Sequence, residues 1–402
     1  MRSRHSLIIS IVSIFAVLVL GASFVLAYTN GTRQGTPLIY AEKDMLQELW
    51  ASYKRNYIEE SSGRTLDKQL DNITTSEGQS YTMLRAVWMD DRQTFDKSWQ
   101  WTKDNLQRDD SLMSWKFGRL PNGSYGVQES VGGQNTATDG DTDIALALLM
   151  AYSRWKDDDY LYDAQPIINS VWEKEVVQIN KKPVLVANDL ERANMEEVIV
   201  NPSYFSPYAY KIFAHVDKEH DWNGLADNSY ALLDRMQSEK LDKQKSAGLA
   251  PDWVTMNRMT GEISALDNPN LTTKFSYDAI RTPWRLALDY AWFKDERSKQ
   301  LLQSYKLLGS EWDKNGRLAA VYEHDGRAAA TYDTPAFYGA TMGYFKVIEP
   351  EKAREVYTRK LSNLYDPNEQ KHAKTLSYYD DNWSWFGTAL YLDELPNLTV
   401  DN

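Results

Sequence analysis

Three short segments of the sequence place carboxylates just ahead of apolar stretches with helical spacing. The carboxylates, each with its segment, are Glu77 in 74–79, Asp139 in 137–145 and Asp278 in 277–285. Carboxyl groups held close together can divide acid and base work, because a protonated one donates a proton while an ionised one accepts it. This chemistry requires three segments that are far apart in the sequence to meet in the fold.

Glu77 has a structural interpretation beside the functional one. Ser76 or Thr75 could cap a helix whose apolar face lies between 83 and 88, and the helix dipole favours a carboxylate in the first turn. A helix start lowers the pKa of a carboxyl group. A general acid at this position therefore needs burial or a neighbouring carboxylate to raise its pKa. The sequence leaves open which effect is larger.

The segment around Asp139 admits the same two interpretations. Asp139, Asp141 and Asp143 alternate ahead of an apolar helix, and some of them could serve only as a cap and as dipole-favoured acids. A calcium-binding EF-hand is excluded, because Ile144 stands where that loop needs glycine and Met150 stands where it needs glutamate.

The segment around Asp278 also has a structural interpretation. Asp278 and Arg281 could form a surface ion pair at a helix entry, which contributes little to stability. Pro283 is tolerated early in a helix, where its missing N–H would have no partner. Taken singly, none of the three segments identifies an enzyme.

The elements that must position these carboxylates are predicted to be helices, because apolar residues recur on one helical face in successive segments. The predicted helices cover 41–57, 76–90, 94–108, 140–156, 161–178, 206–219, 221–239, 279–294, 297–311, 333–347, 350–365 and 381–394. Short β-like runs at 183–186 and 198–200 are too few for a βαβ enzyme. Twelve helices in one domain can pack as six hairpins in a closed ring, with a cleft formed by the N-terminal ends of the inner helices.

Composition and charge exclude several classes of function. The 402 residues are 42% hydrophobic and 25% charged, as in folded globular proteins, and the net charge of -12 argues against a nucleic-acid partner. The absence of cysteine excludes disulfides, thiolate metal sites and cysteine nucleophiles. Five histidines without paired metal spacing, and no phosphate-binding glycine loop after a strand, lead us to expect neither metal nor cofactor.

The N-terminal segment differs from the rest of the chain. Arg2, Arg4 and His5 precede an apolar run over 7–27, which is typical of an export signal or a membrane anchor. Basic residues ahead of such a run keep the N-terminus in the cytoplasm, so the remaining chain is expected to be secreted or tethered outside the cytoplasmic membrane. The assigned parts are a signal or anchor at 1–28, a linker at 29–40 and one globular domain at 41–402.

Together and in this order, the three segments resemble glycoside hydrolase family 8. The family's motifs are Ser-Glu-Gly-Gln-x-Tyr-x-Met-Leu, matched at 76–84, Ala-Ser/Thr-Asp-Ala/Gly-Asp leading into a helix, matched at 137–155, and Tyr-Asp-x-x-Arg-x-Pro-Trp-Arg, matched at 277–285. The resemblance runs from about 45 to about 395 and implies an all-α (α/α)6 barrel. It also implies inverting cleavage of β-1,4-linked glucans, xylans or chitosan.

The resemblance implies a role for each residue of the carboxylate segments. Glu77 would be the general acid that protonates the leaving oxygen, and Asp278 the base that activates water. Asp139 would hold the sugar at the cleavage point and help tune the acid. Inversion requires the two carboxyl groups to stand roughly 6.5–9.5 Å apart. Arg281 would keep Asp278 ionised, because an opposite charge lowers a carboxyl pKa, and Tyr277 would orient the attacking water.

A site that binds several sugars should be lined with aromatic side chains, because sugar rings stack their apolar faces on them. The candidates are Trp115, Trp284, Tyr378 and Tyr379, of which the last two belong to a segment similar to the family's Tyr-Tyr-Asp. Each could instead pack in the core, and for Trp284, which follows Pro283 into a helix, the core role is favoured.

Three functions remain open from the sequence. The first is a monomeric, endo-acting β-1,4-glycanase. The second is a membrane-tethered hydrolase that trims an exopolysaccharide as its producer secretes it, which the apolar run at 7–27 suggests. The third is a glycan-binding or assembly protein that no longer hydrolyses. The motifs do not specify which sugar is bound, or whether cleavage is internal or terminal.

Overall fold

The computed structural model describes residues 36–400, with side chains from residue 44 onward. The polypeptide divides into two units, 1–47 and 48–402, and the second contains all of the predicted site residues. Within residues 36–400, no helix combines the length and the apolar character that a membrane span requires.

The predicted N-terminal parts fall mostly outside this range. The signal or anchor at 1–28 and residues 29–35 of the linker lie outside the described residues. The remaining linker residues, 36–40, begin helix α2 (Thr36–Tyr57), which therefore starts five residues ahead of the predicted 41.

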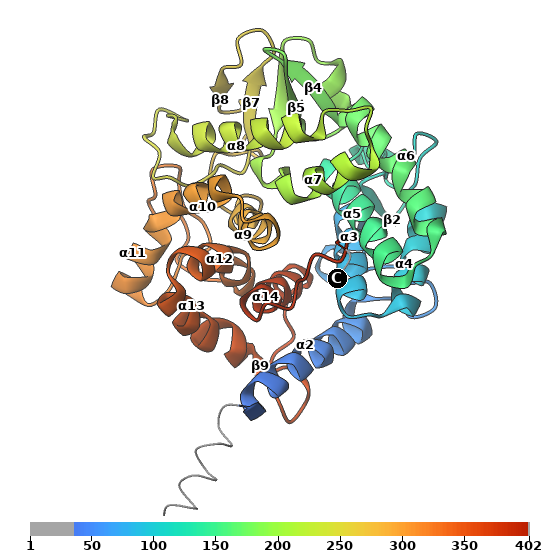
Figure 1. The fold of residues 1–402 in the computed structure, drawn as a ribbon, viewed down its shortest axis with the longest axis vertical. Helices are drawn as coiled ribbons and strands as arrows, with labels where there is room; N and C mark the ends of the chain where they lie inside the picture. The colour runs from blue at the N-terminus through green and yellow to red at the C-terminus, as the bar shows by residue number, and fades with distance from the viewer. Residues whose placement is uncertain (1–35, 401–402) are drawn as a thin grey trace, which may run out of the picture. The chain divides into compact units, whose positions relative to one another are not determined.

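The unit 48–402 is built largely from helices (Figure 1). The helices after α2 are α3 (Ser76–Trp88), α4 (Arg92–Asn105), α5 (Thr138–Trp155), α6 (Asp158–Glu175), α7 (Pro207–Val216), α8 (Trp222–Ser238), α9 (Arg281–Phe293), α10 (Glu296–Leu302), α11 (Lys306–Asn315), α12 (Pro335–Ile348), α13 (Pro350–Val356) and α14 (Tyr378–Tyr391). Every predicted helical segment contains helix. The segment 297–311 is two helices, α10 and α11, joined by a 3₁₀ turn, and α14 starts three residues before the predicted 381.

Six helices form the inside of a ring in this unit. Each of α3, α5, α7, α9, α12 and α14 packs against the next one in that order. Contacts between α14 and α3 close the ring: Asp381 pairs with Arg85 at 3.2 Å, and the ring of Trp383 packs edge-on against Tyr81. The outer helices α4, α6, α8, α10 and α13 each pack on the inner helix that precedes them (Figure 1). The predicted ring of helix hairpins, an (α/α)6 barrel, is confirmed.

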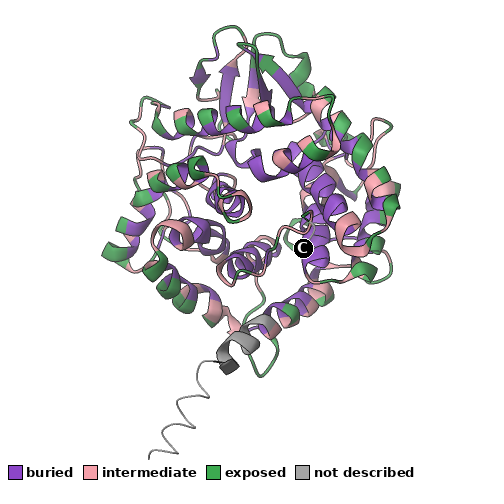
Figure 2. Cartoon of the chain, in the orientation of Figure 1, coloured by how far each residue is buried: buried purple, intermediate pink, exposed green. Residues whose placement is uncertain are grey.

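Burial explains which helices are inner and which are outer. Figure 2 shows the inner helices buried along most of their length, polar residues such as Arg85 and Asp289 included, whereas the outer helices alternate buried and exposed residues. Close approach between α12 and α14 depends on Gly339 and Gly387, because a Cβ on either glycine would collide with the backbone of the other helix. The buried side chains of the inner helices, packed against one another, therefore form the core of this unit.

Short antiparallel strands occupy the loops. They are β1 (Thr74–Thr75), β2 (Lys116–Arg119) and β3 (Tyr125–Val127) in one sheet, β6 (Glu197–Val200), β7 (Val254–Asn257) and β8 (Ile263–Ser264) in another, and the pairs β4 (Val176–Ile179) with β5 (Lys182–Leu185) and β9 (Tyr365–Asp366) with β10 (Lys371–His372). The predicted β-like runs correspond to β5 and β6. Strand β1 leads directly into α3, and β6 and β7 adjoin the loops that contact Asp278.

Candidate active site

One guanidinium group lies among the three predicted carboxylates. Nη1 of Arg281 donates to Oε2 of Glu77 at 2.5 Å and to Oδ2 of Asp139 at 2.9 Å, and Nη2 donates to Oδ1 of Asp278 at 2.6 Å. The guanidinium group is planar and rigid, so the two oxygens that it binds, Oε2 of Glu77 and Oδ1 of Asp278, are no more than about 7.5 Å apart. The fold thus brings together the three segments singled out in the sequence.

Glu77 is placed by the start of α3. The side chain of Thr75 caps this helix by accepting from the N–H of Gly78 at 3.0 Å, which decides between the two predicted caps. Every residue of α3 except Glu77 is buried, and the Glu77 side chain remains 24% exposed. The rest of the helix is fixed in the core, so Glu77 is the one side chain of α3 that can meet a substrate.

Asp139 is placed by a close contact between the starts of α5 and α3. A Cβ at Gly140 would lie 2.5 Å from Oγ of Ser76, so only glycine allows the two helix ends to approach this closely. The Asp139 side chain is 3% exposed. The two acids that follow have other partners: Asp143 forms an ion pair with Arg285, and Asp141 accepts from the N–H of Met113. Neither of these two caps α5, whose N-cap is Ala137, so their roles are structural but are not the predicted cap.

Asp278 lies in the loop just before α9, and every side chain bonded to its carboxylate is a donor. Besides Arg281, Nδ2 of Asn201 donates to Oδ1 at 3.0 Å, and Nε1 of Trp253 donates to Oδ2 at 3.0 Å. The Asp278 side chain is 31% exposed. Asn201 and Trp253 were missed in the sequence, because single polar or aromatic residues beside short strands form no recognisable spacing.

The sequence left open whether the helix start lowers the pKa of Glu77 or its surroundings raise it, and the structure shows that the surroundings raise it. Burial, which is the largest cause, raises the pKa of Glu77, as do the charges of Asp139 and Asp278, while Arg281 opposes them; the combined result is a pKa of about 7. Burial also raises the pKa of Asp139 against the effect of Arg281 and Arg285. Glu77 is therefore a carboxyl group that can carry a proton near neutral pH.

Two buried tyrosines close to the carboxylates were not predicted. The guanidinium of Arg281 lies 5.3 Å from the ring centre of Tyr204, which packs edge-on against Trp253. Tyr81 stands four residues after Glu77, on the same face of α3. Burial and the nearby carboxylates raise the pKa of both hydroxyl groups, so both stay neutral. The four-residue spacing from Glu77 was the sequence signal that could have identified Tyr81.

Tyr277 and Tyr379 lie at the surface beside Asp278. Tyr277 is 42% exposed, and its hydroxyl is 3.4 Å from that of Tyr332, which is itself 52% exposed and was not predicted. Tyr379 packs edge-on against Tyr277 and donates its hydroxyl proton to the backbone carbonyl of Tyr277. The Tyr277 hydroxyl thus faces another tyrosine, which does not support its predicted role of orienting water at Asp278.

The remaining aromatic candidates differ in their access to solvent. Trp115 is half-buried beside the start of α3, and its Nε1 donates to the carbonyl of Gly132 at 2.9 Å. Trp284 is 3% exposed and lies in the core between Trp88 and Trp383, which is the role that the sequence favoured and which corrects its place among the stacking candidates. Tyr378 is 5% exposed, so it too offers no ring face to a sugar.

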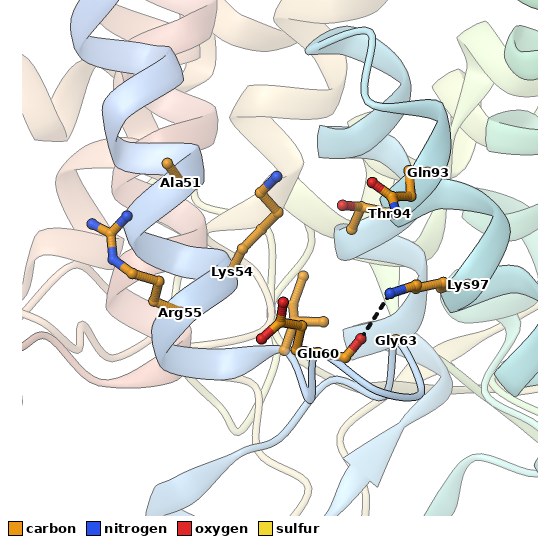
Figure 3. A pocket seen from close by; sticks show the side chains of 9 residues that line it. Ala51, Lys54, Arg55, Glu60, Gly63, Gln93, Thr94 and Lys97 are labelled. Atoms are coloured by element: carbon orange, nitrogen blue, oxygen red, sulfur yellow. Dashed lines mark hydrogen bonds between the residues drawn. The ribbon is translucent and has the colours of Figure 1, made fainter.

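A polar pocket of about 540 Å³ between α2 and α4 is a separate feature (Figure 3). Two of its three basic residues are already engaged, since Lys54 pairs with Asp91 at 2.6 Å and Lys97 donates to the carbonyl of Glu60 at 3.0 Å. None of the three carboxylates lines this pocket. In the part of the chain that the structure describes, no group of three or more His, Cys, Asp or Glu side chains could hold a metal ion.

Comparison with known proteins gives one consistent family. The family model described as glycosyl hydrolases family 8 matches residues 37–379. Endoglucanase 2 of Ruminiclostridium josui is 29% identical over 312 residues, which are 75% of this chain and 63% of that protein. A probable endoglucanase of Novacetimonas hansenii is 32% identical over 272 residues, which are 66% of this chain and 71% of that protein. The chain thus spans less than two thirds of the Ruminiclostridium enzyme.

Solved structures show the same fold. The endo-1,4-D-glucanase from Vibrio fischeri ES114 aligns with a TM-score of 0.73 at 24% identity, over 86% of this chain and 94% of that one. The endo-β-1,4-glucanase CMCax from Acetobacter xylinum aligns with a TM-score of 0.68 at 25% identity, over 87% of this chain and 99% of that one. These likenesses agree with the ring of helix hairpins described above.

Proposed function

This chain belongs to family 8 of the glycosyl hydrolases, and from that premise we propose that it hydrolyses internal bonds of a β-1,4-linked glucan with inversion. The relatives compared above carry endoglucanase names, which supports a glucan as the substrate. The observation that carries the proposal is the meeting of Glu77, Asp139 and Asp278 at the guanidinium of Arg281.

Glu77 acts as the general acid. With its pKa near 7 it holds a proton under neutral conditions and donates it to the oxygen that leaves the cleaved linkage. Once the proton has gone, the new carboxylate already has the Arg281 guanidinium at 2.5 Å, so its charge is stabilised without rearrangement. The solvent exposure of Glu77 gives the linkage access to this carboxyl group.

Asp278 acts as the general base. It accepts a proton from a water molecule, which attacks the anomeric carbon from the face opposite to the leaving oxygen. A carboxylate offers about four acceptor positions, and three are taken by Arg281, Asn201 and Trp253. One position is left for the water, and the three donors fix the direction in which it lies.

Asp139 and Arg281 set the charge of the site. Asp139 is too deeply buried to reach far toward solvent, but its charge helps to keep Glu77 protonated. Arg281 holds all three carboxylates in one arrangement. Around them, the half-buried or exposed rings of Trp115, Tyr277 and Tyr379 are the proposed surfaces for sugar rings.

A second candidate function is the trimming of an exopolysaccharide by the same chemistry at the cell surface. The apolar run at 7–27, preceded by basic residues, supports export with either cleavage or retention as an anchor. We place the catalytic unit outside the cytoplasmic membrane, as a monomer. Deletion of the gene separates the two functions. Altered exopolysaccharide with normal growth on cellulose supports trimming, and normal exopolysaccharide with lost growth on cellulose contradicts it.

The catalytic proposal is tested by replacing Glu77 with glutamine, which keeps the shape of the side chain and removes the acid. Reducing ends released from soluble β-glucan, the fall in its viscosity and the anomer formed first, seen by NMR, are measured for the unmodified protein and Glu77→Gln. We expect an α-anomer product and rapid loss of viscosity from the unmodified protein, and neither from Glu77→Gln.

The matched control is Glu60→Gln, at an exposed glutamate outside the carboxylate cluster. This variant should behave as the unmodified protein does. Full activity in Glu77→Gln would refute the assignment of the acid. Binding of oligosaccharides without any turnover by the unmodified protein would favour a glycan-binding function instead.

A further inference from the structure

A buried carboxylate behind the loop of Asp278 has no part in the chemistry described so far. Asp252 is 4% exposed. Its Oδ1 accepts from the backbone N–H groups of Ser276 at 3.1 Å, Asp278 at 3.2 Å and Ala279 at 2.7 Å. Its Oδ2 accepts from the hydroxyl group of Ser276. The loop that carries the proposed base is therefore wrapped around the Asp252 side chain.

The position of Asp252 is itself fixed by backbone pairing. Its N–H donates to the carbonyl of Lys274 at 2.7 Å, and the N–H of Trp253 donates to the carbonyl of Thr272 at 3.0 Å. Trp253, the next residue, also donates to the Asp278 carboxylate. Asp252 thus holds the backbone of Asp278 while its neighbour holds the side chain.

We propose that Asp252 is a positioning residue for the base, which fixes the loop 276–279 so that Asp278 keeps its distance and direction to the attacking water. This inference rests on the proposed function, because it assigns a role through Asp278. Without the Asp252 oxygens, three N–H groups, of which that of Ala279 is buried and the other two are part-buried, would lose their acceptor, and the loop would move to find others. A displacement of about 1 Å in a reacting group costs on the order of 100-fold in rate.

Asp252 also interacts with Asp278 electrostatically, in addition to holding its backbone. Burial and the charge of Asp278 raise the pKa of Asp252 to about 7, while the hydrogen bonds from Ser276 and Ala279 oppose this effect. Tyr379 on α14 is a further titratable group whose pKa the charge of Asp252 raises. Near neutral pH, Asp252 is therefore only partly ionised, and above that range it presents to Asp278 a negative charge that an amide would not.

The experiment compares three variants at Asp252 with the unmodified protein on soluble β-glucan. Asp252→Ala removes the acceptors, and we expect kcat to fall about 100-fold with KM within threefold, since Asp252 does not reach the substrate. Asp252→Asn keeps an oxygen for the three N–H groups and should retain kcat within about tenfold. Asp252→Glu keeps the charge but displaces the oxygens, so kcat should fall at least tenfold.

Two controls separate positioning from general stability. Ser276→Ala removes only the hydroxyl donor to Asp252, and we expect kcat within threefold of the unmodified protein. Asp91→Ala removes a carboxylate that caps α4 through the N–H of Thr94 and lies outside the site. It should lower the melting temperature without lowering kcat.

Each outcome decides one of the two proposals. If the unmodified protein hydrolyses β-glucan and folded Asp252→Ala keeps kcat within threefold, the positioning role is wrong and the proposed function stands. Should Asp252→Ala fail to fold, unchanged kcat in Asp252→Glu would overturn the role just as well. If the unmodified protein releases no reducing ends from any β-glucan, the proposed function fails, and the positioning role fails with it.

Discussion

Replacing Asp139 with asparagine should lower the pKa of Glu77 and move the alkaline limb of the pH profile. Both carboxylates bind Nη1 of Arg281, at 2.5 Å and 2.9 Å, so their bound oxygens are no more than about 5.4 Å apart. At an effective dielectric constant of about 20, unit charges at that separation repel by about 3 kcal/mol, equivalent to roughly two pKa units.

The expected shift is smaller than this value, because solvent reaches the Glu77 side chain, which is 24% exposed, and because burial also raises the pKa of Asp139, which reduces the average charge that Asp139 carries. We expect a fall of about one pKa unit. The sign follows from the causes: burial and the charges of Asp139 and Asp278 raise the pKa of Glu77, and Arg281 lowers it. Removing a negative neighbour makes the proton easier to lose, and it also leaves Arg281 freer to stabilise the Glu77 carboxylate.

The assay is kcat/KM on soluble β-glucan between about pH 4 and pH 9, for the unmodified protein and Asp139→Asn. An alkaline limb that reports the general acid should move down by about one pH unit. Glu60→Gln, which changes an exposed carboxylate outside the cluster, should leave the limb in place. A limb that stays fixed or moves to higher pH in Asp139→Asn would refute the electrostatic account of Glu77.

Three further predictions concern the scaffold. Gly140→Ala should lower kcat on β-glucan at least tenfold with a modest loss of melting temperature, because its Cβ would push the starts of α3 and α5 apart. Trp284→Ala should reduce the free energy of unfolding in urea by about 3–5 kcal/mol. Glu175 is buried with a pKa raised to about 8, so the folded state holds its proton more tightly than the unfolded state does, and stability should fall as pH rises from about 4.5 to about 8. Glu175→Gln should reduce that slope in melting temperatures measured across this range.

Local patterns were enough to predict the helices and the three carboxylate segments that meet at Arg281. An apolar face recurring at helical spacing reports burial whatever the rest of the chain does, which is why every predicted helical segment contains helix. Boundaries were less reliable. The break between α10 and α11 and the early start of α14 depend on tertiary contacts that periodicity does not record.

The solvent exposure of the aromatic side chains could not be predicted from the sequence. Trp284 and Tyr332 are both aromatic residues near a helix start, yet one is 3% exposed in the core and the other is 52% exposed beside Tyr277. Exposure depends on which elements pack against a side chain. Asn201 and Trp253 were missed for the same reason, because they belong to the site only through loops that the fold brings to Asp278.

The sequence by itself determined which carboxylates are available, that helices carry or follow them, and which family they resemble. Only the tertiary structure decided their chemistry. The proton affinity of Glu77 depends on burial and on charges up to 204 residues away in the sequence, which the fold brings close to it in space. Electrostatic energy falls with distance in space, not along the chain, so the roles of acid and base come from packing.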